Sequence, residues 1–183
     1  MRVRWGLRLA LVVATGVLAA GCGSDPGSTA SGPSLPAPPT APVNAEGKPI
    51  TSLCELLSRQ DIAEVTGLAA TEPTAEGATS AAAVCKYGAD VEVAIAANGS
   101  IDAASATYQS ALQGTAFSNV IKQGPIGGVD ESVYATGVGV NSLGLRRQKL
   151  VVAIMLPSTA ERAEIKLIQL AGRLLSRANA LGT

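Results

Sequence analysis

The chain has 183 residues, with 14 basic and 14 acidic side chains and no histidine. Because histidine is the commonest general base and the commonest metal ligand, its absence argues against histidine-based catalysis and against a metal site. Three of the basic residues lie in a segment that we expect to be removed. This leaves 11 basic side chains against 14 acidic ones, and the net negative charge argues against nucleic acid as a partner.

Residues 1–21 have the three parts of an export signal: a basic start, an apolar centre and small residues before a cysteine. The apolar centre has about 12 residues, whereas a membrane-spanning helix needs roughly 20. Leu18-Ala19-Ala20-Gly21-Cys22 is a variant of the bacterial lipobox, in which small residues precede an acylated cysteine. We expect lipid on Cys22 to hold the protein at the extracytoplasmic face of a bacterial cell membrane. The alternative is an ordinary secretory signal with a chance cysteine.

Residues 22–49, which begin with the lipidated cysteine, are predicted to form a disordered tether. Residues 23–49 hold seven of the ten prolines and almost no large apolar side chains, so they cannot offset their chain entropy by burial. Their reach is between about 30 Å as a flexible coil and about 80 Å as extended polyproline II. Two P-x-x-P matches, beginning at Pro33 and Pro36, leave a recognition motif as the alternative.

Residues 50–183 are predicted to form a single domain that opens with two capping boxes. The first, at Ser52, starts a short turn, and the second, formed by Ser58 and Asp61, starts a helix that Gly67 ends.

Strand signals follow a polar stretch at residues 71–80, which is expected to be a loop or a ragged edge strand. Alternating apolar residues predict strands at 84–87 and 91–97. Residues 98–100 then cap a helix, and Gly114 closes it.

Three more strands are predicted in the second half of the domain, at residues 117–122, 132–140 and 145–156, with a turn at Asn141-Ser142. The last of them contains seven consecutive apolar residues, which places it centrally in a sheet that is covered on both sides. Short connections between these strands predict antiparallel hairpins.

The last helix is predicted to start at Pro157-Ser158, with Ser158 and Glu161 as another capping box. Its apolar residues, from Leu167 to Leu181, fall on one face at 100° per residue. Basic residues occupy the opposite face.

Cys54 and Cys85 are the only cysteines left in the domain, and outside the cytoplasmic membrane two thiols usually pair. A redox pair is the alternative, but redox cysteines usually form C-x-x-C at a helix start. We expect a structural disulfide that closes a loop of about 30 residues and contributes roughly 3 to 4 kcal/mol. The fold class is therefore α+β: an antiparallel sheet of about five or six strands, a long C-terminal helix on one face, and short N-terminal helices tied by the disulfide.

Other candidate sites have less support. The carboxylate pairs Asp61 with Glu64 and Asp130 with Glu131 are expected to be solvated, and the glycines of residues 124–139 are expected to form hairpins rather than a phosphate loop. Seven basic residues offer contacts to an anionic surface, although a solvated charged face is the simpler interpretation. They are Arg146, Arg147, Lys149, Arg162, Lys166, Arg173 and Arg177.

Three blocks of the sequence, residues 53–67, Cys85-Lys86-Tyr87 and residues 128–134, resemble the domain-of-unknown-function 3558 family. The resemblance extends along the whole chain, from the lipidated signal and spacer to the final helix. In that family the aromatic residue after the second cysteine is usually Trp, whereas Tyr87 stands here. The resemblance implies an exported actinobacterial lipoprotein and carries no established role.

We expect a non-enzymatic, membrane-tethered module, without cofactor or metal, that binds a small ligand or another envelope protein. The alternative is a carrier whose sheet and helices enclose an apolar ligand. An envelope hydrolase comes third, because the histidine that would activate a serine is missing.

Overall fold

The computed structural model describes residues 41–124 and 126–181, in which seven strands form one sheet. The strand order is β1-β2-β3-β7-β6-β5-β4, and every neighbouring pair is antiparallel. The α+β class is confirmed, with seven strands rather than five or six. The strands are β1 (Thr74–Glu76), β2 (Ala82–Lys86), β3 (Glu92–Ala97), β4 (Asn119–Gln123), β5 (Glu131–Gly137), β6 (Val140–Arg147) and β7 (Leu150–Pro157).

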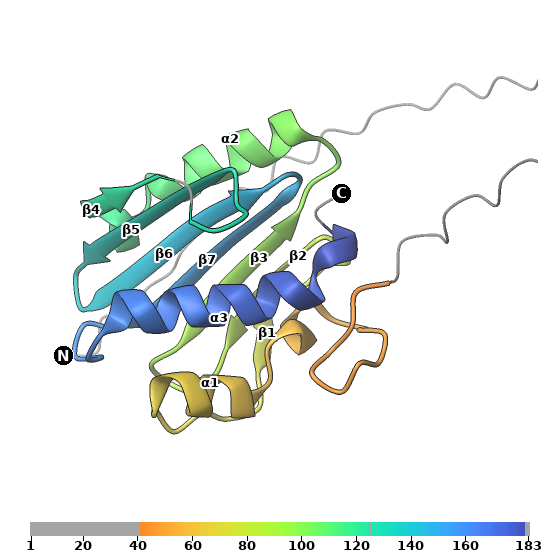
Figure 1. Ribbon diagram of the computed structural model, residues 1–183, viewed down its shortest axis with the longest axis horizontal. Coiled ribbons are helices and arrows are strands. Elements are labelled where there is room, and N and C mark those ends of the chain that lie inside the picture. The colour runs from red at the N-terminus through yellow and green to blue at the C-terminus, as the bar shows by residue number, and fades with distance from the viewer. Residues whose placement is uncertain (1–40, 125, 182–183) are drawn as a thin grey trace, which may run out of the picture. The chain divides into compact units, whose positions relative to one another are not determined.

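The long helix α3 crosses one face of the sheet, and α2 lies against the other (Figure 1). The short helices η1 and α1 lie beside α3, at the β1–β2 end of the sheet. In the described part of the chain, no helix is both long enough and apolar enough to span a bilayer. The helices are η1 (Leu53–Leu56), α1 (Arg59–Thr66), α2 (Ile101–Leu112), η2 (Thr115–Phe117), α3 (Ala163–Arg177) and η3 (Asn179–Leu181).

The central strand β7 separates two apolar clusters, as its uninterrupted apolar sequence predicts. Val152 and Ile154 belong to the cluster under α3, and Val151 and Ala153 belong to the cluster under α2. Successive side chains of a strand point to opposite faces, so a strand with a helix on each side must be apolar at nearly every position. The sheet, both clusters and the disulfide all lie within residues 41–181, so a chain that begins at residue 41 keeps the entire described core.

The predicted capping box of α1 is confirmed. The Ser58 side chain accepts a hydrogen bond from the Asp61 backbone N–H at 3.1 Å, and the Asp61 carboxylate accepts one from the Ser58 backbone N–H at 2.8 Å. Gly67 follows the helix in the left-handed conformation, with φ of 72°, which glycine adopts without steric cost.

The last part of the predicted tether has structure. Val43 forms a bridge with Pro49, and the Asn44 side chain accepts hydrogen bonds from the backbone N–H groups of Glu46 and Lys48. The Val43 N–H donates to the carbonyl of Arg177 at the end of α3. Residues 41–49 are thus held against the domain by their own turn and by a contact with α3. The export signal, the lipidation site Cys22 and residues 23–40 lie outside the described residues.

The predicted turn at Asn141-Ser142 is wrong, because both residues lie inside β6. The strand predicted at 145–156 is instead two strands joined by a two-residue turn at Gln148-Lys149. Hydrogen bonds from elsewhere in the chain fix this turn: the Gln148 N–H donates to the Asp130 carboxylate at 2.6 Å, and the Asn98 N–H donates to the Lys149 carbonyl at 2.8 Å. Gln148 and Lys149 are not residues typical of a two-residue hairpin, so the local sequence did not predict this turn.

The predicted start of the last helix is also wrong. Ser158 lies in a turn, where its N–H donates to the Gly139 carbonyl of the β5–β6 hairpin. The helix begins at Ala163, after Arg162, and Arg162 makes no side-chain cap. The contact with the neighbouring hairpin has overridden the local capping signal.

Candidate functional site

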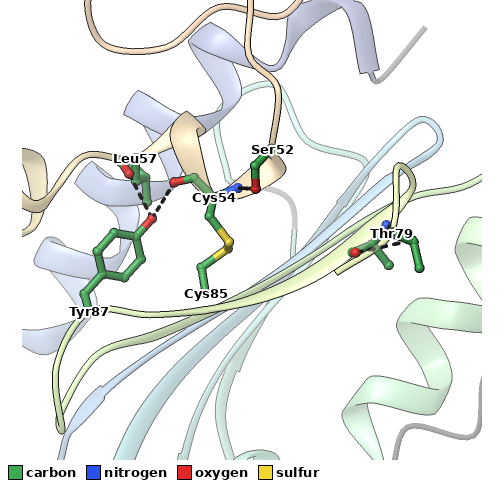
Figure 2. Close-up of a disulfide and its surroundings, with 7 residues drawn as sticks. Ser52, Cys54, Leu57, Thr79, Cys85 and Tyr87 are labelled. Carbon is green, nitrogen blue, oxygen red and sulfur yellow. Dashed lines mark hydrogen bonds between the residues drawn. A yellow bond between two sulfur atoms is a disulfide. The ribbon is translucent and has the colours of Figure 1, made fainter. Parts of the chain in front are cut away.

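The disulfide between Cys54 and Cys85 is present and joins η1 to β2, with a Cα–Cα distance of 5.4 Å. The Tyr87 hydroxyl lies beside it and donates to the carbonyls of Cys54 and Leu57, at 3.0 and 2.9 Å (Figure 2). Burial raises the pKa of Tyr87 far above its ordinary value. The aromatic residue after the second cysteine thus fastens the same segment that the disulfide holds, which indicates a structural role for both.

The carboxylate of Asp61 is buried, and the expectation that it is solvated is wrong. Its side chain is 5% exposed and accepts hydrogen bonds from two arginines of α3. Arg177 donates to both carboxylate oxygens, at 2.6 and 3.0 Å, and Arg173 donates to Oδ1 at 2.8 Å. Arg173 also reaches Glu64, one turn further along α1, at 2.9 Å. Three basic residues of the α3 face that was expected to be solvated, Lys166, Arg173 and Arg177, thus form the contact between α3 and α1.

The electrostatics of this cluster favour a fixed anion. Burial alone would raise the pKa of Asp61, but the hydrogen bonds from Arg177, from the Ser58 backbone and from Arg173 outweigh it and hold the pKa well below its ordinary value. Asp61 is therefore ionised at neutral pH and has no proton to give, so it is unsuited to general acid catalysis.

Four other predicted cationic residues do not form a common surface. Lys166 donates to the Thr66 carbonyl at the end of α1. Arg146 bonds the carboxylates of Asp130 and Glu131, at 3.0 and 2.6 Å. For Lys149 and Arg162 the structure gives no ion pair within the described residues, and Arg162 is exposed. The structure therefore disperses the seven predicted cations, most of them onto partners of their own chain.

An apolar pocket lies between α3, β6 and the loop that joins β4 to β5, on the face of the sheet that α3 crosses. It is partly open to the surface and has a volume of about 140 Å³. All of its lining residues are aliphatic or glycine: Ile126, Gly127 and Val129 of the loop, Leu143 and Leu145 of β6, and Ile168, Ala171, Gly172 and Leu175 of α3.

Gly172 explains part of the hollow. It sits inside α3, where glycine costs about 1 kcal/mol relative to alanine. Apart from its chain neighbours and the backbone of its own helix, no atom lies within 4 Å of the position that a Cβ would occupy there, so packing does not require a glycine. Gly172 is exposed and lines the pocket, so the missing side chain leaves the edge of the pocket open at the expense of helix stability.

A second hollow, of about 150 Å³, lies between the turn at residues 44–46 and η1. Its three carboxylates already have partners: Glu46 accepts from Asn44, Glu55 from Thr51, and Glu72 pairs with Arg59. Within residues 41–124 and 126–181, no cluster of three or more metal-ligating side chains could hold a metal ion. The apolar pocket is therefore the better candidate for a binding site.

The family model described as "Protein of unknown function (DUF3558)" matches residues 17–142, more than half of the chain. The chain belongs to the DUF3558 family. No curated protein matches it. The matched region includes the disulfide and Asp61 and ends at residue 142, inside β6. In this DUF3558 protein the arginines that bind Asp61 therefore lie beyond the match, as do the pocket walls that β6 and α3 form.

One indirect signal of the pocket in this DUF3558 domain is present in the sequence, the glycine at position 172 inside an otherwise regular helix pattern. The other lining residues are ordinary core residues in type and spacing. Their arrangement around a hollow depends on how the loop at 126–129 meets α3, which no local pattern reveals.

Proposed function

We propose that this DUF3558 protein is a non-enzymatic binding module of the cell envelope, and that its apolar pocket receives one apolar group of a ligand or of a partner protein. The observation that carries the proposal is the pocket itself, which is open at the surface and lined only by aliphatic residues and glycine. Convergent apolar lining in a partly open hollow is the usual character of a binding site.

The size of the pocket favours recognition of a single group over transport of a whole lipid. Pockets that bury drug-sized ligands have volumes of about 300 to 1,000 Å³. The volume here is about 140 Å³. An engineered apolar cavity of roughly that size, about 150 Å³, holds one benzene molecule. A carrier would have to enclose far more of its cargo, so we place the carrier hypothesis second.

The charged groups support a non-enzymatic role. Asp61 is ionised and held by two arginines, and Arg146 holds both Asp130 and Glu131. The chain has no histidine to act as a base. Both carboxylate pairs that the sequence singled out, Asp61 with Glu64 and Asp130 with Glu131, are thus engaged in ion pairs.

Attachment to the membrane is part of the same proposal and rests on the signal and the lipobox variant that ends at Cys22. Metabolic labelling with a palmitate analogue in the native host tests it. We expect label in the full chain and none in the Cys22→Ser variant. Equal label in both chains would contradict the proposed anchor.

Binding in the pocket is tested with toluene, a probe of benzene size, added to residues 41–183 with labelled Ile, Leu and Val methyl groups. We expect NMR shifts at the methyls of Leu143 and Ile168, which line the pocket, and small shifts elsewhere. Gly172→Leu should abolish them by filling the hollow. Ser176→Leu is the matched control, because it adds the same side chain to another exposed position of the same helix that does not line the pocket. Shifts that survive Gly172→Leu would contradict the proposal.

A further inference from the structure

One cation stands at an end of the apolar pocket. Leu145 lines the pocket, and Arg147 lies two positions further along β6, on the same face of the strand. The guanidinium group of Arg147 donates from Nη1 to the carbonyl of Leu175, at 3.4 Å, and Leu175 is also a lining residue. The charge is therefore at the end of the pocket that Leu175 forms.

Arg147 retains hydrogen-bonding capacity. Nη2 donates to the side chain of Asn179 at 3.1 Å, so both described partners of Arg147 are uncharged. A guanidinium group has five N–H donors, and these two bonds leave about three of them free for an anion. The side chain is partly exposed, which gives an incoming anion access.

The neighbouring arginine, Arg146, differs from Arg147 in the face of β6 that it occupies and in the charge of its partners. Arg146 points to the opposite face of β6 and is neutralised by Asp130 and Glu131. No carboxylate of the described residues is paired with Arg147 in this way. The sequence alone does not distinguish the two arginines. In the structure, only Arg147 lies beside the apolar pocket without a carboxylate partner among the described residues.

The length of the pocket fits a short alkyl chain. Along α3 its lining runs from Ile168 to Leu175, which corresponds to about 10 Å at 1.5 Å per residue. An extended chain of eight carbons has about this length. Gly172 lies between those two residues and leaves the middle of the pocket clear.

We propose that the pocket binds an alkyl carboxylate, with the chain along α3 and the carboxylate on the guanidinium group of Arg147. This inference rests on the proposed function, because it names the ligand class of the same pocket. The apolar chain loses its contact with water, and the carboxylate makes charge-assisted hydrogen bonds to the donors of Arg147 that have no partner. The ligand is a short alkyl carboxylate, free or carried by a larger molecule, rather than a phospholipid within a bilayer.

The test compares sodium octanoate with 1-octanol, which has the same chain and no charge, on residues 41–183 by the methyl NMR titration. We expect octanoate to bind more tightly than octanol. Arg147→Gln should weaken octanoate binding about 10-fold to 100-fold and leave octanol binding unchanged, because hydrogen bonds to a charged group are worth about 1.5 to 3 kcal/mol. Arg146→Gln is the matched control and should leave both affinities unchanged. Gly172→Leu should abolish both.

Three results would overturn the inference. Equal affinity for octanoate and octanol, with no effect of Arg147→Gln, would remove the role of Arg147 and leave the apolar pocket of the proposed function intact. If none of the probes bound to the wild-type chain, toluene included, the proposed function would be contradicted as well. Sedimentation with vesicles of phosphatidylglycerol, without binding of octanoate, would show that the relevant anion is a membrane surface.

Discussion

Replacement of Asp61 by Asn should destabilise the domain, because Asp61 is the anion of a buried ion pair. The variant keeps the shape of the side chain, but its amide nitrogen cannot accept hydrogen bonds, and the negative charge is lost. Arg177, whose side chain is 18% exposed, would then be left without its anion. Breaking a buried ion pair on one side costs about 3 to 5 kcal/mol. We expect about 3 kcal/mol, because Arg173 is more exposed and keeps Glu64.

Urea unfolding of residues 41–183 at pH 7 measures this loss. The matched control is Glu64→Gln, on the same helix, which removes a half-exposed carboxylate bound to Arg173. Solvent screens such an exposed pair, so its loss should have little effect on stability. If Asp61→Asn cost no more than Glu64→Gln, the cluster would not be the buried ion pair that we describe.

The pH dependence gives the same prediction a second check. The pKa of Asp61 is lowered in the folded state, so its contribution is complete above the unfolded-state pKa of about 4 and is lost as the pH falls through the folded-state value. Below pH 4 the difference in unfolding free energy between wild type and Asp61→Asn should shrink by about 1.4 kcal/mol per pH unit. A difference that stays constant from pH 7 to pH 3 would refute the assignment.

Three further predictions concern the stability of the same segment, residues 41–183. Replacing Cys54 and Cys85 together by Ala should lower the unfolding free energy by roughly 3 to 4 kcal/mol in urea, since the bond closes a long loop. A loss below 1 kcal/mol would show that removing the disulfide adds little conformational freedom to the unfolded chain. Gly172→Ala should raise the melting temperature, with a gain of up to about 1 kcal/mol, because alanine favours the helix and meets no neighbour; a loss of stability would mean that the pocket wall tolerates no Cβ. Gln148→Gly should stabilise the chain by about 1 kcal/mol in thermal unfolding, because Gln148 has φ of 52°; a destabilised variant would show that the turn is unstrained.

The sequence predicted the elements whose signals are local. The reciprocal bonds of Ser58 and Asp61 and the left-handed Gly67 lie within one helix, and the alternation of β3 and the continuous apolar run of β7 report directly on burial. The disulfide followed from counting the cysteines of an exported domain. In each case the residues that determine the structure are close in sequence or have only one available partner.

The features that the sequence missed depend on distant contacts. The turn at Gln148 is fixed by Asp130 and Asn98, and the residues of the turn itself are not typical of hairpins. Asp61 is buried because Arg173 and Arg177 approach it from more than 100 positions away. A carboxylate on a short amphipathic helix looks solvated until the helix that covers it is known.

The candidate site was missed for a similar reason. Leu143, Leu145 and Leu175 are typical core residues, and no pattern shows that the loop before β5 leaves a gap beside them. Arg147 could be named as a cation, but its position at the end of an apolar pocket follows only from the pairing of β6 and the packing of α3.

Crystals of residues 41–183 pressurised with xenon offer the most direct test of the apolar pocket. Xenon occupies empty apolar cavities of this size without needing any polar contact. We predict a xenon atom between β6 and α3, in contact with Leu143 and Ile168 and next to Gly172. If xenon bound elsewhere in the crystal and the side chain of Ile126 closed this pocket, the proposal that the pocket is the binding site would be contradicted.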